Sequence, residues 1–166
     1  MNKTLLIYGM PSLGKSTLIR ELSKDFNAQI IHIDSFWKEI SNPIYNKTES
    51  EFVFDLFLIE YMKQLKMQKS LILLEGVFAT KSKIRLLEQL SENYNSTLFK
   101  ILLYDSIENI IKKNRERFQK EGKHISKQAL IKLYNNFETF SLSTYSYNMA
   151  NKTTHSIYSE IKKLIL

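Results

Sequence analysis

The sequence lacks cysteine and has no apolar segment long enough to cross a membrane. Without cysteine, the 166-residue chain can form no disulfide, thiolate metal site or cysteine nucleophile. No apolar run approaches the roughly 18 residues that a membrane-spanning helix needs. The early apolar stretch, which includes Leu5 and Ile7, stops at Gly9 and is shorter than the roughly 7–15 residues of a signal-peptide core. We therefore expect a soluble, cytoplasmic protein that does not bind membranes.

What the chain does contain is an ordinary globular composition with an excess of positive charge. Hydrophobic residues make up 43% and charged residues 25%, which is typical of a folded domain. We expect one domain spanning residues 1–166. The net charge of +7 favours an anionic partner, either a nucleotide or a nucleic acid. Because the lysines are scattered along the chain, charge alone does not decide between these partners.

Short apolar segments alternate along the chain with segments of helical periodicity. The apolar segments predict strands at residues 3–8, 30–33, 71–74 and 98–104, and a fifth within 145–150. This alternation predicts a parallel sheet covered by helices on both faces, an α/β fold. Such sheets bind ligands at the carboxyl ends of their strands. Gly9, Asp34, Glu75 and Asp105 all lie at predicted carboxyl ends.

A complete phosphate-binding motif follows the first predicted strand. The motif comprises Gly9, Met10, Pro11, Ser12, Leu13, Gly14, Lys15, Ser16 and Thr17. Backbone N–H groups in such a loop ring an anion, and the following helix adds its positive end. We expect Lys15 to reach the β- and γ-phosphates of ATP, Ser16 to coordinate Mg²⁺ and Thr17 to contact the α-phosphate. A turn with an incidental lysine is the alternative interpretation, which the strand–loop–helix context disfavours.

Other classes of phosphate-loop protein match the chain less well than kinases do. The segment Asn46-Lys47-Thr48-Glu49 matches the base-reading motif of GTPases only in part, and it precedes the third strand. Nothing resembles the signature motif of transporter ATPases, and 166 residues are few for a ring-forming ATPase. These observations leave a kinase.

Two carboxylates are candidates for the chemistry of phosphoryl transfer. Asp34 follows the second strand, where it could accept a proton from an attacking hydroxyl and orient that oxygen. The alternative is that Asp34 caps a helix at residues 35–40. Glu75 ends the third strand and could hold Mg²⁺ through water, although apolar strands often end in an acid.

A cluster of cations in the second half of the chain is typical of a mobile lid. Lys112-Lys113-Asn114-Arg115-Glu116-Arg117 leads into Lys120-Glu121-Gly122-Lys123-His124, and we expect a lid at about 113–125. Arginines in a lid can neutralise the charge that develops on a transferring phosphoryl group. We expect Arg117, ahead of Arg115, in this role. The alternative is a solvated helix end whose cations complement the helix dipole.

Taken together, these motifs resemble the small P-loop kinases of the polynucleotide-kinase, zeta-toxin and gluconate-kinase-like clan. The resemblance covers nearly the whole chain: the segment 113–126 and Tyr134 are similar to the clan's lid and following helix, and Thr153-Thr154 to its approach to the adenine site. It implies a three-layer α/β/α P-loop NTPase fold with a five-stranded parallel sheet and a helical lid. It also implies ATP and Mg²⁺ as cofactors.

The acceptor side departs from the polynucleotide kinases of this clan. Their base-bearing aspartate is followed three residues later by an arginine, whereas this chain has Trp37 there and Lys38 next to it. Asp34-Ser35-Phe36 and Leu74-Glu75-Gly76 instead look like uridine-kinase motifs, whose acceptor is a nucleoside. We expect Trp37, Lys38 and Arg85 to contact the acceptor, Trp37 through its aromatic face. Tyr45 and the Phe-rich segment from Phe52 to Phe57 also lie where such kinases place acceptor-binding elements. The alternative is that these aromatic residues belong to the core.

The prediction from sequence is an ATP-dependent kinase that phosphorylates a hydroxyl of a small molecule, such as a nucleoside or nucleotide. One alternative is a polynucleotide 5′-hydroxyl kinase, which the positive charge and the lid resemblance favour. A second is a non-catalytic, nucleotide-dependent regulatory protein that keeps the loop without an acceptor.

Overall fold

One parallel sheet organises the chain, as the alternation of segments predicts. The computed structural model describes residues 2–122 and 125–166. Within them the sheet has five strands in the order β2-β3-β1-β4-β5, and every neighbouring pair is parallel. The strands are β1 Asn2–Gly9, β2 Gln29–His32, β3 Leu71–Gly76, β4 Ser96–Tyr104 and β5 Tyr145–Asn148. The predicted α/β fold, including the fifth strand, is confirmed.

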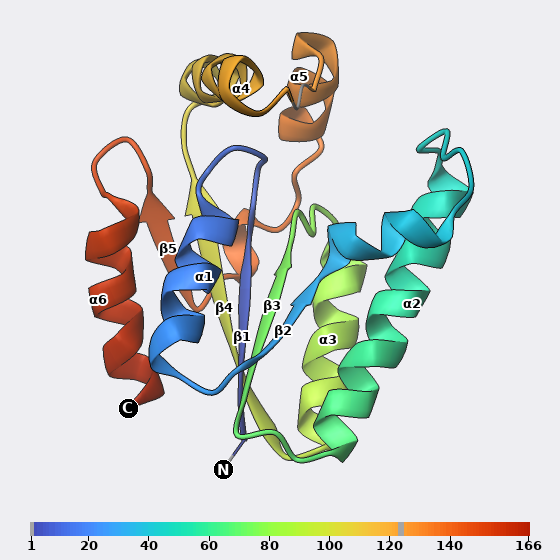
Figure 1. Cartoon of the computed structure of the whole chain (residues 1–166), viewed down its shortest axis with the longest axis vertical. Coiled ribbons are helices and arrows are strands. Elements are labelled where there is room, and N and C mark those ends of the chain that lie inside the picture. Colours follow the sequence, from blue (N-terminus) through green and yellow to red (C-terminus); the bar gives the residue numbers. More distant parts are fainter. Residues whose placement is uncertain (1, 123–124) are drawn as a thin grey trace.

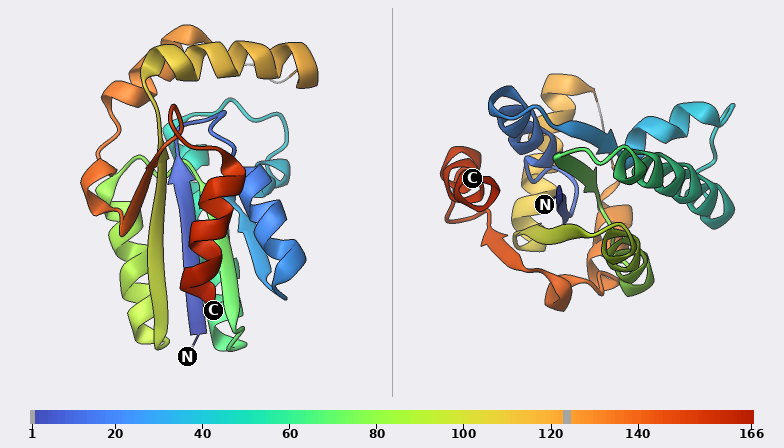
Figure 2. Two further views of the ribbon diagram at one scale, coloured as in Figure 1. Left: turned by 90° about the vertical axis from the view of Figure 1, so that its left-hand side faces the viewer. Right: turned by 90° about the horizontal axis from the view of Figure 1, so that it is seen from below.

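Helices cover both faces of the sheet and one of its ends. The helices are α1 Lys15–Asp25, α2 Lys47–Lys66, α3 Lys81–Asn93, α4 Ile107–Glu121, α5 Lys127–Asn135 and α6 Thr154–Ile165, with two 3₁₀ helices, η1 Ile33–Glu39 and η2 Phe140–Leu142. Helices α1 and α6 lie on one face, and α2 and α3 lie on the other (Figure 1). Helix α4 lies across the carboxyl ends of the strands (Figure 2, left). In the described residues, no helix is long and apolar enough to span a membrane.

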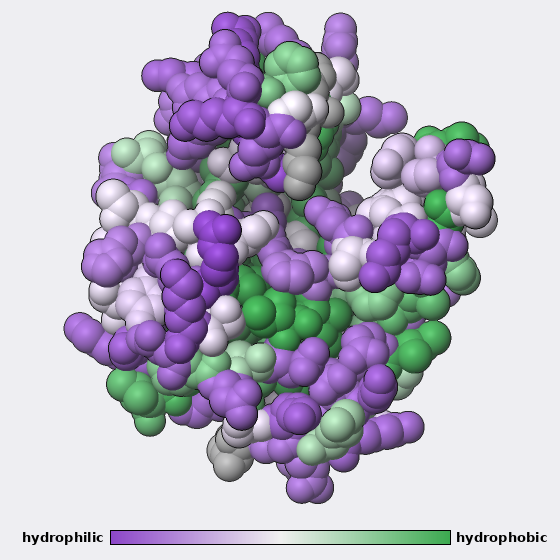
Figure 3. Space-filling view, viewed as in Figure 1, coloured by the Kyte–Doolittle hydropathy of each residue, from purple (hydrophilic) through white to green (hydrophobic). Residues whose placement is uncertain are grey.

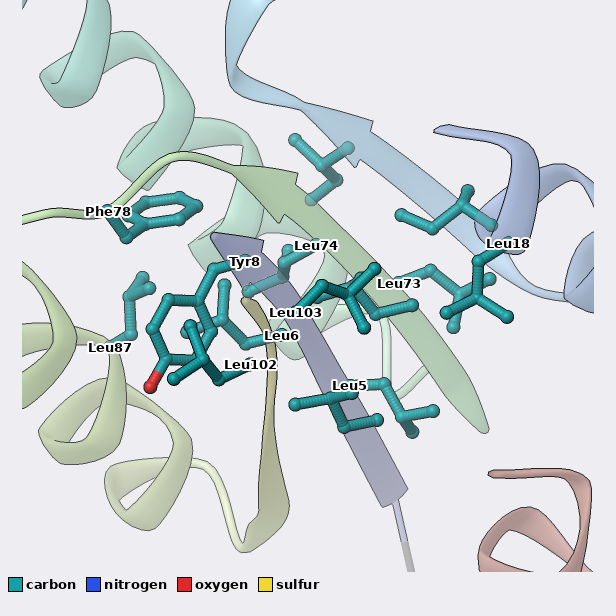
Figure 4. Close-up of a cluster of buried hydrophobic side chains, with 14 of the residues drawn as sticks. Leu5, Leu6, Tyr8, Leu18, Leu73, Leu74, Phe78, Leu87, Leu102 and Leu103 are labelled. Atoms are coloured by element: carbon teal, nitrogen blue, oxygen red, sulfur yellow. The ribbon is translucent and has the colours of Figure 1, made fainter. Parts of the chain in front are cut away.

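The core lies on both sides of the central strand β1. Leu5, Leu6 and Tyr8 of β1 are completely buried. Because successive side chains of a strand point to opposite faces, Leu5 and Leu6 serve different layers of the core. In Figure 4, Tyr8 lies with Phe78 on the side of α3, and Leu18 of α1 lies on the other side. Burial on both faces explains why these strands are almost continuously apolar.

The expected lid is mostly a regular helix. α4 spans Ile107–Glu121 and ends at Gly122, whose φ of 68° permits a left-handed helix end. The Nδ2 of Asn114 donates to the carbonyl oxygen of Ile125 at 2.9 Å, which ties α4 to the start of α5. Lys123 and His124, part of the predicted cluster, lie outside the described residues.

Two segments near the second strand differ from the simplest expectation. The helix expected at 35–40 is the 3₁₀ helix η1, whose N-cap is His32, so Asp34 does not cap it. The partial GTPase motif is the start of α2: the Asn46 side chain accepts a hydrogen bond from the backbone N–H of Glu49 at 2.8 Å. Asn-x-x-Glu at this place is therefore a helix-capping pattern.

Candidate phosphate-binding and transfer site

Glycine geometry shapes the loop between β1 and α1. Gly9 has a φ of 142°, and a Cβ there would lie 2.0 Å from the carbonyl oxygen of Leu103 in β4. Gly14 has a φ of 81° and is the N-cap of α1. A side chain at either position would be strained, and the backbone instead turns closely over the end of the sheet. The loop thereby presents the N-terminus of α1, a binding site for an anion.

Lys15 lies folded within this loop. Its ammonium Nζ donates to the carbonyl oxygen of Met10 at 2.8 Å, and the residue is 8% exposed. Burial lowers the pKa of Lys15 to about 8; Glu75 and Asp34 oppose this shift, and Arg117 adds to it. The carboxylates and the lid arginine are therefore all within electrostatic reach of the same ammonium group.

Ser16, Glu75 and His32 form a hydrogen-bonded cluster beside the loop. The Ser16 hydroxyl donates to Glu75 Oε1 at 2.5 Å, and His32 Nδ1 pairs with Glu75 Oε2. Burial alone would raise the pKa of the Glu75 carboxyl, but the hydrogen bonds from His32 and Ser16 outweigh it and lower that pKa. The hydrogen bond with Glu75 likewise raises the pKa of His32. Glu75 is thus held as a carboxylate.

The oxygen atoms of Ser16 and Glu75 fit a magnesium ion. Mg²⁺ prefers oxygen ligands and is commonly held by one or two protein groups, with phosphates and water completing the shell. The direct Ser16–Glu75 hydrogen bond shows that the two side chains converge on one point. In the described part of the chain, no group of three or more His, Cys, Asp or Glu could hold a metal ion by itself. Ser16 and Glu75 together supply the one or two protein groups that Mg²⁺ commonly takes beside phosphates and water.

One cleft of about 970 Å³ joins the loop to the candidate acceptor residues. Asp34, Trp37 and Tyr45 line it on one side, and Lys113, Arg117 and Lys120 of α4 line it from above. The complete predicted phosphate loop except Gly9 and Met10 also lines it. In Figure 3 the strongly hydrophilic surface of the lid is at the top, and a hollow separates it from the arm that ends in the α2 start.

Several predicted residues lie away from this cleft. Arg115 is exposed and does not line the cleft. Arg117, two residues later, does line it, and its Nε lies 2.9 Å from a Glu121 carboxylate oxygen. Lys38 and Arg85 are also exposed and do not line the cleft. Phe54 and Phe57 of α2 belong to the core.

The lid helix is attached to the ends of two strands. The Asp105 side chain, which is fully buried, accepts hydrogen bonds from Lys113 Nζ at 2.6 Å and from Asn109 Nδ2 at 2.8 Å. Lys113 Nζ also donates to the carbonyl oxygen of Met149, after β5, at 3.3 Å. Asp105, expected at the ligand-binding edge, instead anchors the start of the lid.

The predicted adenine side lies next to the phosphate loop. A Cβ on Gly14 would lie 3.1 Å from the Thr154 hydroxyl oxygen, at the start of α6. Thr153 caps that helix through its side chain. This contact places Thr154 beside the loop, and its part in the approach to the adenine site stays a prediction.

His32 is a site residue that the sequence reasoning missed. It lies opposite Glu75 in the register of β2 and β3, and this pairing depends on β2 being the neighbour of β3. Strand order is not visible in the sequence. The available signal was a polar residue at the end of an apolar strand, two positions before Asp34.

A family model for the ATPase family associated with various cellular activities (AAA) matches residues 5–163. The chain belongs to this family. The match includes the phosphate loop, Asp34, Glu75 and the lid of this AAA-family protein. No curated protein matches the chain.

Solved structures similar to this AAA-family protein are small kinases in several cases. A gluconokinase from Sinorhizobium meliloti has a TM-score of 0.72 and 12% identity, covering 98% of this chain and 91% of its own. Shikimate kinase from Aquifex aeolicus has a TM-score of 0.59 and 16% identity, covering 98% and 95%. A chain of the Pnkp1/Rnl/Hen1 RNA repair complex has a TM-score of 0.68 and 19% identity, covering 82% and 44%. The predicted P-loop NTPase fold and the resemblance to small kinases are confirmed.

Proposed function

We propose that this protein is a kinase that transfers the γ-phosphate of ATP to a hydroxyl of a small molecule. The observation that carries the proposal is that Asp34 lines the same cleft as Lys15 and Arg117. A nucleotide hydrolase needs a positioned water, whereas a kinase needs a carboxylate beside an open acceptor space. Asp34 has that place, and its exposure leaves it accessible to an incoming alcohol.

Five side chains of the cleft have roles in this reaction, together with the N–H groups of the loop. The loop N–H groups and Lys15 bind the β- and γ-phosphates. Asp34 accepts the proton of the acceptor hydroxyl, whose oxygen forms the new bond to the γ-phosphorus while the bond from that phosphorus to the β–γ bridging oxygen breaks and ADP leaves. Arg117 neutralises the charge that develops on the phosphoryl oxygens. Ser16 and Glu75 would hold Mg²⁺, Glu75 through water, and the bound ion would neutralise phosphate charge.

The charge of the lid favours polynucleotide 5′-hydroxyl kinase activity as a second candidate. Residues 107–135 contain eight basic side chains against three acidic ones, so this segment accounts for most of the net charge of +7. A polyanion bound there would release counterions, and its affinity would fall steeply with salt. Trp37 in place of the phosphate-binding arginine argues for the small-molecule acceptor.

The proposal is tested by measuring ADP formation and acceptor phosphorylation across nucleosides, sugars, antibiotics and 5′-hydroxyl oligonucleotides. We expect ADP to form only when one class of small alcohol is present, and the phosphoester product to form in an amount equal to the ADP. Salt-sensitive phosphorylation of oligonucleotides would favour the second candidate. Tight ATP binding with no phosphoester from any compound would contradict both and indicate a regulatory protein.

A further inference from the structure

The cleft has an aromatic wall next to the proposed base. The ring centroids of Trp37 and Tyr45 lie 4.8 Å apart with their planes tilted by 45°, and both residues line the cleft. Trp37 follows Asp34 by three residues in the 3₁₀ helix η1. Side chains three residues apart in a 3₁₀ helix eclipse each other, so Trp37 and Asp34 project from the same side of η1. An alcohol that reaches Asp34 therefore meets the indole.

Local contacts hold this wall in place. Tyr45 has a φ of 56°, which is uncommon for a residue with a side chain and persists only where neighbours enforce it. The Glu49 carboxylate supplies that restraint, since it accepts hydrogen bonds from the backbone N–H groups of Ile44 at 2.9 Å and Tyr45 at 2.6 Å. On the other side of η1, Phe36 packs edge-on against the buried Phe57 with centroids 6.4 Å apart. Phe36 is thus committed to the core, whereas Trp37 faces the cleft.

Cationic side chains and aromatic side chains line different parts of the cleft. In the described part of the chain, the lysines and arginines that line the cleft come from the phosphate loop, α1 and α4: Lys15, Arg20, Lys113, Arg117 and Lys120. His32 of β2 also lines the cleft, and its imidazole is paired with Glu75. The segment with Trp37 and Tyr45 contributes aromatic rings, and Tyr45 is 68% exposed. Val77, Ile125 and Leu133 add apolar surface to the same cleft. Aromatic faces of this kind stack on flat rings.

We infer that the acceptor is an uncharged alcohol carrying a flat ring, of the chemical kind of a nucleoside, which stacks on the wall of Trp37 and Tyr45. This inference rests on the proposed kinase function and names its substrate class. The ring occupies the aromatic wall and the hydroxyl meets Asp34. The cations on the other side of the cleft are then left to the phosphates of ATP. A carboxylate such as gluconate or shikimate finds no matching cation on the wall itself.

Trp37 is the single tryptophan of the chain, so its fluorescence reports binding without any turnover. We would titrate the protein with the four common ribonucleosides and with a set of neutral aryl alcohols, and separately with nucleoside 5′-monophosphates, gluconate and shikimate. The inference expects saturable quenching by at least one neutral ring-bearing alcohol, with weaker or no quenching by its phosphorylated or carboxylate counterparts. Quenching by charged compounds alone, or by none of the panel, would overturn it.

A variant series then connects the wall to catalysis. Trp37→Ala should raise the KM of the acceptor by about 10–100-fold and leave the KM of ATP unchanged, whereas Trp37→Phe should restore most of the acceptor affinity. Phe52→Ala is the matched control, because Phe52 is a 48% exposed aromatic residue outside this cleft. Thermal unfolding of each variant checks that it folds.

The inference and the kinase proposal can fail separately. Normal phosphorylation of a ringless or charged acceptor by Trp37→Ala would overturn the inference while keeping the kinase proposal. Saturable quenching by a neutral ring-bearing alcohol, with no phosphoester formed from it in the presence of ATP and Mg²⁺, would support the ring-binding wall and contradict the kinase proposal.

Discussion

The two halves of the cleft are built in different ways. The donor half is one continuous stretch from Gly9 to Thr17, turned by glycines and backed by the buried strand β1. The other half combines η1 and the loop before α2 with a lid more than 60 residues further along the chain, whose cations would serve the phosphates. Lys15 is almost fully buried, whereas Tyr45 is largely exposed. In the proposed site, phosphate binding would therefore depend on local backbone geometry, and acceptor binding on how segments distant in the sequence meet.

The largest loss of activity is expected when the lysine of the phosphate loop is removed. Lys15→Ala removes the ammonium group that the loop encloses, and kcat should fall by roughly 10²–10³-fold, with weaker ATP binding. Steady-state kinetics and ATP titration measure both. Lys24→Ala, an exposed lysine on the same helix, is the control and should behave as wild type. An active Lys15→Ala variant would remove the basis of the whole interpretation.

We expect the lid to contribute to kcat through Arg117 and not through Arg115. Arg117→Ala should lower kcat by about 10²-fold, because the side chain lines the cleft above the loop, and Arg115→Ala should change it less than about threefold. The two variants remove the same charge from the same helix, so they separate position from net charge. Equal losses in both would show that the lid acts through its overall charge.

The buried lysine also predicts a pH dependence. Burial lowers the pKa of Lys15 to about 8, so its ammonium is present below pH 8 and is lost as the pH rises above it. ATP affinity should therefore be nearly constant below pH 7, fall about twofold between pH 7 and 8, and be up to about tenfold lower by pH 9, as one proton is linked to binding. Isothermal titration at each pH measures this change. In Lys15→Met the same range should be flat, and an unchanged slope there would assign the titration to another group.

The smallest effect concerns the loop that carries the aromatic wall. Asn46→Ala removes the side-chain cap of α2 and should lower the free energy of unfolding by about 1 kcal/mol. Urea unfolding measures the difference, with the exposed neighbour Lys47→Ala as the control. If both variants were equally stable, the capping interaction would contribute nothing to the stability of α2.

The difference between the two halves of the cleft also explains how much of the structure could be predicted from the sequence. The strands, the loop and the chemistry of Lys15 and Ser16 are local, so periodicity and one motif predict them. The His32–Glu75 pair could not be predicted, because it depends on β2 lying beside β3. The sequence favours Arg117 over Arg115, and the structure adds that Arg117 lines the cleft whereas Arg115 does not.

The residue that joins the two halves is Asp34, and its removal tests the central claim most directly. ATP binding and transfer of the γ-phosphate to an acceptor alcohol would be measured in parallel for the wild type and Asp34→Asn. A kinase that uses Asp34 as its base predicts unchanged ATP affinity and a fall in acceptor-dependent kcat of roughly 10²–10⁴-fold. Equal rates of acceptor phosphorylation in the two proteins would contradict that claim.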